Sequence, residues 1–163
     1  MRSGFEAELV DLLPQLRRFA LSLCRSGDLA DDLVQITAER AFAAQATFDP
    51  GARLGPWLFR ILRNAWLDQL RRRRTAGIAL EPQDIDRVEA FDGGAAVEAA
   101  LTLRSVEAAM KTLSEDHRTI LHLVCIEELS YAAAAEVLDV PKGTVMSRLA
   151  RARIALAERL GLE

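Results

Sequence analysis

The stretch that most restricts the fold is residues 130–153, SYAAAAEVLDVPKGTVMSRLARAR. Ser130 predicts the start of a short helix, because a serine side chain accepts a hydrogen bond from the unpaired N–H groups of a first turn. Pro141 and Gly143 then interrupt the helical pattern, since proline lacks an N–H donor and glycine relaxes the backbone. Thr144 is the expected cap of a second helix. Two helices joined by so short a break form a helix-turn-helix.

Each of these two helices has an apolar face and a polar face. The inward positions recur at helical spacing; they are Ala134, Val137, Leu138, Val145, Leu149 and Ala152. The outer side of the second helix keeps Met146, Ser147, Ala150, Arg151 and Arg153. Arginine bonds guanine O6 and N7 together, and serine bonds a base or a phosphate, so this side suits contact with DNA. A helical hairpin with a solvated basic side is the alternative for this stretch by itself.

The composition indicates a packed, soluble protein. Of the 163 residues, 50% are hydrophobic and 28% are charged, the balance of a folded domain. No apolar run reaches the about 18 residues of a membrane span, and the first residues lack the apolar core of a signal peptide. Strand-like alternation and internal repeats are absent from the sequence. We therefore expect an all-α protein of the cytoplasm, with Cys24 and Cys125 as reduced core residues.

Charge is distributed unevenly along the chain. The formal net charge is −3, which argues against a histone-like binder. Residues 1–75 carry 12 basic and 9 acidic side chains, residues 76–104 carry 2 and 6, and residues 105–163 carry 7 and 9. A basic front, an acidic middle and a mixed end predict three different electrostatic tasks.

Helical spacing predicts three helices in the basic front part, over residues 5–23, 29–46 and 57–74. Pro14 falls inside the first and predicts a late start or a kink there. Asp28 is the expected cap of the second helix. The core side of that helix is expected to be Leu33, Ile36, Ala41 and Phe42. Its polar side complements the helix dipole and stays solvated; it carries Asp31, Asp32, Gln35 and Glu39.

The third helix places two tryptophans, Trp57 and Trp66, among arginines. Residues 71–74 are four consecutive arginines, the densest basic run in the chain. Aromatic rings stack on unpaired bases and arginines neutralise phosphates, so the pattern predicts a surface for single-stranded nucleic acid. The alternatives are core packing for Trp66 and a solvated helix end for the arginine run.

Residues 76–98 separate this part from the helix-turn-helix. The segment is acidic and contains three glycines and a proline, which predicts an extended linker. Beyond it, helices are expected over residues 99–113 and 115–127, the second capped by Ser114. Because like charges extend the linker, the helical parts on either side are expected to move independently.

Three segments, in this order, resemble the bacterial extracytoplasmic-function (ECF, group IV) sigma factors of the sigma-70 family. Residues 31–35, DDLVQ, are similar to the E-D-L-x-Q segment of region 2. Residues 57–72 are similar to its W-L-x-x-I-x-x-N-x-x-x-D-x-x-R-R pattern. Region 4 of the family resembles residues 113–118, 129–131 and 143–153, the last reading GTVMSRLARAR. The resemblance covers nearly the whole chain.

The resemblance implies an all-α fold of two small domains, region 2 over residues 1–75 and region 4 over residues 99–163. The acidic linker of residues 76–98 would thread the RNA-exit path of the polymerase. The implied function is that of an alternative sigma factor, which binds core RNA polymerase and directs promoter-specific initiation under the control of an anti-sigma factor. The expected location is the cytoplasm, at the nucleoid when active, without membrane insertion.

The resemblance also assigns residues to each partner. Core polymerase is expected to contact Asp31, Asp32 and Gln35. The −10 element, with one base taken out of the stack, is expected to contact Phe48, Arg53, Trp57, Arg60, Arg63, Asn64 and Arg71. The −35 element is expected to take the last helix in its major groove, against Lys142, Thr144, Met146, Ser147, Arg148, Arg151 and Arg153. No catalytic residue, metal ligand or cofactor is expected.

Two other classes of protein fit parts of the sequence. A stand-alone helix-turn-helix regulator would bind a palindromic site as a dimer, but would leave the front part without a purpose. An enzyme or metalloprotein would have to use His117, His122 and Cys125, which supply too few ligands at this spacing for a tetrahedral metal site. His122 and Cys125 fit better as packing residues, and no phosphate-binding glycine loop is present.

Overall fold

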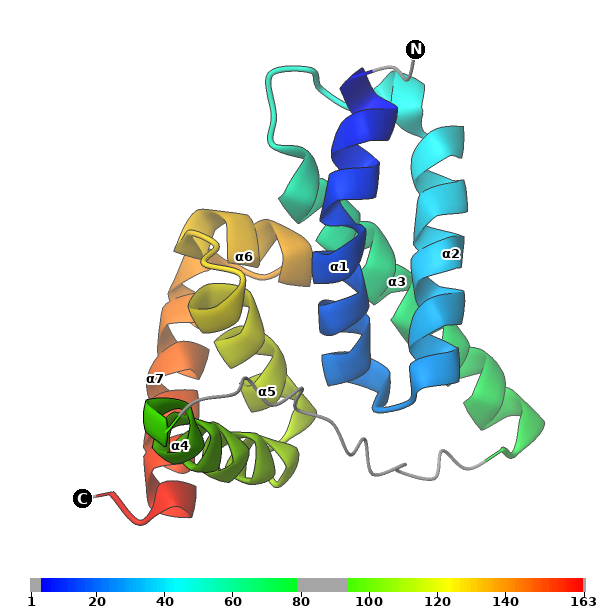
Figure 1. Cartoon of the computed structure of the whole chain (residues 1–163). Helices are drawn as coiled ribbons and strands as arrows, with labels where there is room; N and C mark the ends of the chain where they lie inside the picture. Colours follow the sequence, from blue (N-terminus) through cyan, green and yellow to red (C-terminus); the bar gives the residue numbers. More distant parts are fainter. Residues whose placement is uncertain (1–3, 79–93, 163) are drawn as a thin grey trace.

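The computed structural model describes residues 4–78 and 94–162, with side chains over residues 4–78 and 102–162. The described parts form two groups of helices and contain no strand, and Figure 1 shows the groups side by side. The front unit consists of α1 (Gly4–Cys24), α2 (Gly27–Ala43), the 3₁₀ turn η1 (Gln45–Thr47) and α3 (Leu54–Ala76). The rear unit consists of α4 (Gly94–Lys111), α5 (Glu115–Leu121), the π-helical turn η2 (His122–Ile126), α6 (Tyr131–Leu138) and α7 (Lys142–Leu160). This arrangement confirms the expected all-α fold.

The three long helices of the front unit pack through large apolar side chains. Phe19 of α1, Leu33 of α2 and Leu58 of α3 are fully buried, as their helical spacing predicts. Pro14 lies inside α1, which continues through it. The lost hydrogen bond is tolerable because Val10, whose carbonyl it would have reached, faces solvent.

The ends of the second helix differ from expectation in two places. Ser26 rather than Asp28 caps α2, and its hydroxyl accepts the backbone N–H of Leu29 at 3.4 Å. Asp28 instead stands in the first turn, where a carboxylate complements the helix dipole. Phe42 does not face the core; it is 46% exposed near the end of α2.

The helix-turn-helix forms from α6 and α7 as predicted, and its turn lies inside the break expected over residues 139–143. Ser130 caps α6 by accepting the N–H of Ala133 at 3.1 Å. The chain reverses at Asp139, whose φ of 53° is left-handed, a conformation that a short polar side chain tolerates. Helix α7 begins directly after Pro141, so the cap expected at Thr144 is wrong and Thr144 lies in the first turn. The predicted apolar faces are confirmed as buried.

Expectations for the middle of the chain are tested only in part. Helix α4 begins at Gly94, five residues before its expected start, and most of the expected linker lies in residues 79–93, outside the described residues. Beyond Leu121 the expected helix changes to π-helical hydrogen bonding, with the N–H of Glu127 donating to the carbonyl of His122 at 2.9 Å.

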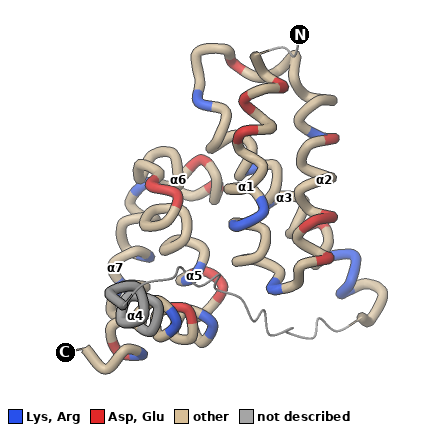
Figure 2. Tube along the Cα trace, viewed as in Figure 1, with Lys and Arg blue, Asp and Glu red and all other residues tan. Residues whose placement is uncertain are grey.

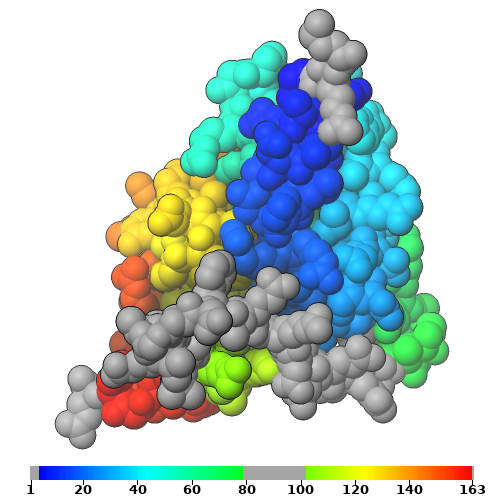
Figure 3. All heavy atoms as spheres, viewed as in Figure 1, coloured from blue at the N-terminus to red at the C-terminus, as the bar shows by residue number. Residues whose placement is uncertain are grey.

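The two units touch along a surface that we call the junction. It is made by Arg18, Ser22, Arg25, Arg63 and Trp66 of the front unit and by Lys111, Glu115, Arg118, Glu127 and Leu138 of the rear unit. Figure 3 shows the yellow segment around η2 directly against the blue α1. In this structure polar contacts hold the two helical parts together, and the expected independent movement stays a prediction.

Candidate nucleic-acid interface

Helix α7 presents a side to solvent that carries most of its polar residues. Because Val145, Leu149 and Ala152 turn inward, the opposite side is left free. Lys142, Met146, Ser147, Arg151 and Arg153 are exposed there, and Thr144 and Arg148 are half-buried. We call these seven residues the −35 face. The Ser147 hydroxyl donates to the carbonyl of Thr144 at 3.1 Å, so it meets a ligand as an acceptor unless that bond breaks.

Four aromatic rings gather where the loop before α3 meets α1 and α2. Phe48 and Trp57 lie 4.9 Å apart, centroid to centroid, at an interplanar angle of 47°. The ring of Phe5 lies 6.1 Å from Phe48 and 6.2 Å from Trp57, and 5.9 Å from Phe42. Phe5 was missed at the sequence level, because a single aromatic residue at a helix start carries no signal of a distant ring cluster. Such clusters hold rings at fixed angles.

A groove of about 440 Å³ opens beside this cluster. One wall carries Phe48, Arg53, Trp57 and Arg60 of the front unit; the other carries Ser130, Ala132, Ala133 and Glu136 of the rear unit. Arg53 and Arg60 are exposed at its mouth, whereas the two rings are half-buried. The structure thus gathers four of the residues predicted to bind the −10 element and sets α6 opposite them.

Arg63, also predicted for the −10 element, is turned towards the rear unit. Its guanidinium donates to the carbonyl of Leu138 at 3.4 Å. Burial lowers the pKa of Arg63 below its usual value, while the carboxylates of Asp116, Glu115 and Asp139 act in the opposite direction. Arg63 is therefore already engaged with the rear unit.

Asn64 and Arg71 lie further along the exposed side of α3. Arg71 donates to Asp68 at 2.7 Å, and Asp68 also pairs with Arg40 of α2 at 3.0 Å. Figure 2 shows the basic end of α3, residues 71–74, at the corner of the molecule away from α6 and α7. Together with Phe48, Arg53, Trp57, Arg60 and Arg63, Asn64 and Arg71 form what we call the −10 face.

The residues predicted to contact polymerase lie on the outer side of α2. Asp31, Asp32 and Gln35 are all exposed there. Asp31 accepts the Nε–H of Arg17 at 2.9 Å, and the Gln35 amide donates to Glu39 at 3.4 Å. These contacts lie within the front unit, so the acidic surface stays open to a partner.

The histidine and cysteine set does not assemble into a metal site. His122 is buried and bonds Glu127 at 3.0 Å, as a packing residue with one polar partner. Cys125 is exposed, so the expectation that it packs in the core is wrong. Within the described residues, no three His, Cys, Asp or Glu side chains are grouped to hold a metal ion.

The chain matches two family models, Sigma-70 region 2 over residues 9–76 and Sigma-70, region 4 over residues 103–156. It is 37% identical over 153 residues to the ECF RNA polymerase sigma factor EcfG of Rhodopseudomonas palustris (strain TIE-1), covering 94% of this chain and 83% of the relative. The chain belongs to the extracytoplasmic-function sigma factors. The sigma factor SigM of Mycobacterium tuberculosis (strain ATCC 35801 / TMC 107 / Erdman) is also 37% identical, over 90% of this sigma factor and 72% of its own length.

Solved structures of sigma factors share the fold. The sigma factor RpoE from Bartonella quintana, solved in complex with the anti-sigma factor NepR, is 35% identical, with a TM-score of 0.81 over 98% of each chain. CnrH, solved with the cytosolic domain of CnrY, is 27% identical, with a TM-score of 0.68 over 96% of this chain and 87% of that chain. The front and rear units of this sigma factor contain the two matched segments, and we call them region 2 and region 4 from here on.

The matched segments contain every residue predicted for polymerase, for the −10 element and for the −35 element. Phe5, which contacts two aromatic rings of the −10 face, lies before the region 2 match. None of the helices in the described residues has the length and apolar character needed to cross a membrane.

Proposed function

We propose that this sigma factor binds core RNA polymerase through the acidic surface of α2, engages the −10 element with the −10 face and reads the −35 element with α7. One observation carries the proposal: Asp32 and Arg151 are exposed on two separate surfaces of one chain, and Trp57 lines a groove on a third. Because the two DNA faces lie on different helices and differ in chemistry, they suit two different DNA structures, one unpaired and one duplex.

The −10 face has the chemistry needed to hold an unpaired base. Taking a base out of the stack costs a few kcal/mol, which a stacking surface must offset. Phe48 and Trp57 supply adjacent ring faces, and a base stacked on an aromatic ring gains about 1–3 kcal/mol. Arg53 and Arg60, at the mouth of the groove, supply positive charge for the backbone of the same strand.

The −35 face has the chemistry needed to read a duplex. An α-helix fits the major groove of B-DNA, where each base pair shows a distinct set of donors and acceptors. Ser147 and Arg151 are separated by four residues, so they share one side of α7 and reach adjacent bases. Arg148 and Arg153 stand to either side, where phosphates pass, and are expected to position the helix.

An anti-sigma factor is the proposed regulator of this sigma factor. RpoE was solved with NepR and CnrH with CnrY, and both folds resemble this one closely enough to support a partner of the same class. The proposed site of action is the nucleoid in the cytoplasm. The protein is proposed to work by binding, as a member of the sigma factors, with no catalytic step of its own.

In vitro transcription with core polymerase on genomic fragments, followed by mapping of start sites, tests the proposal. The chain should direct initiation only in the presence of core polymerase, from sites that share a −10 and a −35 element. In gel shifts, tight sequence-specific binding to a palindromic duplex without polymerase would instead support a stand-alone regulator.

The polymerase surface is tested by the double variant Asp32→Ala, Gln35→Ala. Removing an exposed carboxylate and an exposed amide should reduce co-purification with core polymerase while leaving the helical circular dichroism unchanged. The matched control is Glu8→Ala, Asp11→Ala, which removes two exposed acids from α1 instead. If the α2 variant binds core polymerase as well as the unaltered protein does, this surface is not the polymerase contact.

A further inference from the structure

The junction joins region 2 to region 4 through polar contacts at several points. On the side of α3, the indole N–H of Trp66 donates to the Glu115 carboxylate at 3.2 Å. On the side of α1, the Nε–H of Arg118 donates to the carbonyl of Ser22 at 2.8 Å. The side chains of Trp66, Glu115 and Arg118 therefore make these bonds only while the two regions lie together.

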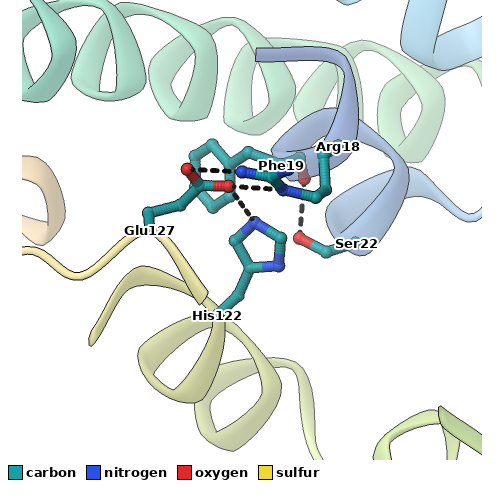
Figure 4. A network of polar contacts seen from close by, with 5 residues as sticks. All are labelled: Arg18, Phe19, Ser22, His122 and Glu127. Atoms are coloured by element: carbon teal, nitrogen blue, oxygen red, sulfur yellow. Dashed lines mark hydrogen bonds and ion pairs between the residues drawn. The ribbon is translucent and has the colours of Figure 1, made fainter. Parts of the chain in front are cut away.

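The most buried acceptor of the junction is the carboxylate of Glu127, whose side chain is 4% exposed. It accepts two N–H groups from Arg18, at 2.9 and 3.0 Å, and meets Nε2 of His122 at 3.0 Å (Figure 4). The His122 ring in turn lies 5.5 Å from the ring of Phe19. Although burial alone would raise the pKa of Glu127, the bonds from His122 and Arg18 leave it below its ordinary value. Arg18 thus neutralises a charge that would be costly to bury unpaired.

The same arrangement brings α6 against the −10 face. Glu136 and its neighbours form the opposite wall of the groove that Trp57 and Arg60 line. The guanidinium of Arg63 already donates to the carbonyl of Leu138. The groove between α6 and the −10 face has a volume of about 440 Å³, so α6 stands close to the rings that a base would stack on, and the carboxylate of Glu136 repels phosphate there.

The −35 face, unlike the groove, is mostly open to solvent. Met146 is 51% exposed, and Ser147, Arg151 and Arg153 are exposed as well. Arg148 is the exception, since it is half-buried and close enough to Arg63 to act on it electrostatically. The closed arrangement therefore covers the part of the −10 face around Phe48, Trp57 and Arg63 and leaves most of the −35 face free.

We propose that region 4 is a removable cover for the −10 face: in the free protein, α6 and single-stranded −10 DNA compete for one surface, while the −35 face stays available to duplex DNA. The inference rests on the proposed function, which makes −10 DNA the ligand of that face. A ligand that binds only an open form is weakened in proportion to the open fraction, so a protein closed for nine tenths of the time binds about tenfold more weakly.

A matched pair of arginines on α1 makes the test. Arg18 and Arg17 are each 50% exposed, and each lies 2.9 Å from a carboxylate. The partner of Arg17 is Asp31 of region 2, whereas the partner of Arg18 is Glu127 of region 4. Arg18→Ala therefore leaves the buried carboxylate of Glu127 with His122 as its remaining side-chain partner, whereas Arg17→Ala removes an ion pair of the same length, with an exposed carboxylate, without touching region 4.

The measurements use the full-length free protein. Small-angle X-ray scattering gives the radius of gyration. Fluorescence anisotropy gives the affinity for two labelled probes from a promoter mapped as above: the single non-template strand of the −10 element and a duplex of the −35 element. Arg18→Ala should enlarge the radius and bind the single strand about five- to tenfold more tightly, with duplex affinity within about twofold. Arg17→Ala should match the unaltered protein in all three.

Exchanging the charges of Arg18 and Glu127 distinguishes loss of their contact from a folding defect. Arg18→Glu alone should open the protein, and Arg18→Glu with Glu127→Arg should close it again and restore weak single-strand binding. An Arg18→Ala protein that stays compact overturns the proposal. So does one that opens without gaining single-strand affinity, or one that gains duplex affinity by the same factor. Failure of the proposed function is seen separately, as absence of promoter-directed transcription by the unaltered protein with core polymerase.

Discussion

The −10 face and the −35 face both carry arginines, but these arginines lie in different surroundings. Both combine arginines with neutral side chains that suit bases. In the −10 face, Arg63 is bonded to the carbonyl of Leu138 and two aromatic rings stand half-buried opposite α6. In the −35 face, Arg151 and Arg153 are exposed on a helix whose other side is buried. From the sequence alone, the residues of both faces are predicted to be free to contact DNA.

This difference shows that the fold, rather than the residue type, decides whether an arginine or a ring is accessible to DNA. Single-strand recognition needs aromatic rings that are held rigidly and do not pack against the apolar surfaces of other molecules. A neighbouring helix provides both conditions. Duplex recognition needs charges at the surface, where they raise the rate of encounter with DNA. The two faces therefore respond to substitution in different ways.

The largest effect is expected from Trp57→Ala. Because a stacked base gains about 1–3 kcal/mol from its ring, open-complex formation should fall by about tenfold to a hundredfold. Trp57→Phe keeps a ring and should recover most of the loss. Permanganate reactivity of unpaired thymines at the −10 element measures this step. Unchanged reactivity would show that the unpaired base lies elsewhere.

A smaller effect, limited to certain promoters, is expected from Arg151→Ala. Loss of a bidentate contact to guanine should flatten preference at one or two −35 positions by about tenfold. Arg153→Ala is the counterpart; it should weaken all promoters alike and reduce the dependence on salt. Transcription from a library of −35 variants at two salt concentrations separates them. An unchanged ranking of variants with Arg151→Ala would make that arginine a phosphate contact.

The smallest effect is expected from Phe5→Ala, which acts through its neighbours. Aromatic pairs contribute about 0.5–1.5 kcal/mol each, so loosened Phe48 and Trp57 rings should slow open-complex formation by about threefold to tenfold. Binding of a −35 duplex should not change, and Phe5→Leu should recover part of the effect. Equal loss in both assays would reduce Phe5 to a residue that stabilises the fold only.

Most of the fold follows from local pattern. Apolar spacing located α1, α2, α3 and the pair α6–α7, and correctly placed Val145, Leu149 and Ala152 inside, because a helix on a core repeats its apolar face regularly. The caps at Ser114 and Ser130 follow from side-chain chemistry alone. The cap at Ser26 and the reversal at Asp139 do not, since several neighbouring polar residues were equally suitable.

The junction was not predictable from pattern. Arg18 and Glu127 lie 109 residues apart, and nothing in either local sequence indicates the other. The like charges of the linker between them instead suggested separate domains. The candidate site divides in the same way: motif spacing supplied the two faces, whereas the place of Phe5 and the engagement of Arg63 depend on tertiary contacts.

Cys125 shows how one turn alters such a prediction. In an α-helix it would share a face with His122, three residues earlier. Hydrogen bonding from each N–H to the fifth residue back widens the turn at η2 and rotates the residues that follow. His122 stays inside and Cys125 turns outside.

The wide turn at η2 also lets the chain carry one more residue without moving Glu127 away from Arg18. A π-helical turn holds one residue more than the α-helical turn it replaces. Loss of a single codon between His122 and Ile126 would therefore restore regular winding and keep Glu127 on the side of α1. Loss of a codon within the regular helix α5 would instead swing Glu127 through about 100°, so in a lineage of such proteins the closed form tolerates a deletion at η2 but not one in the preceding turns.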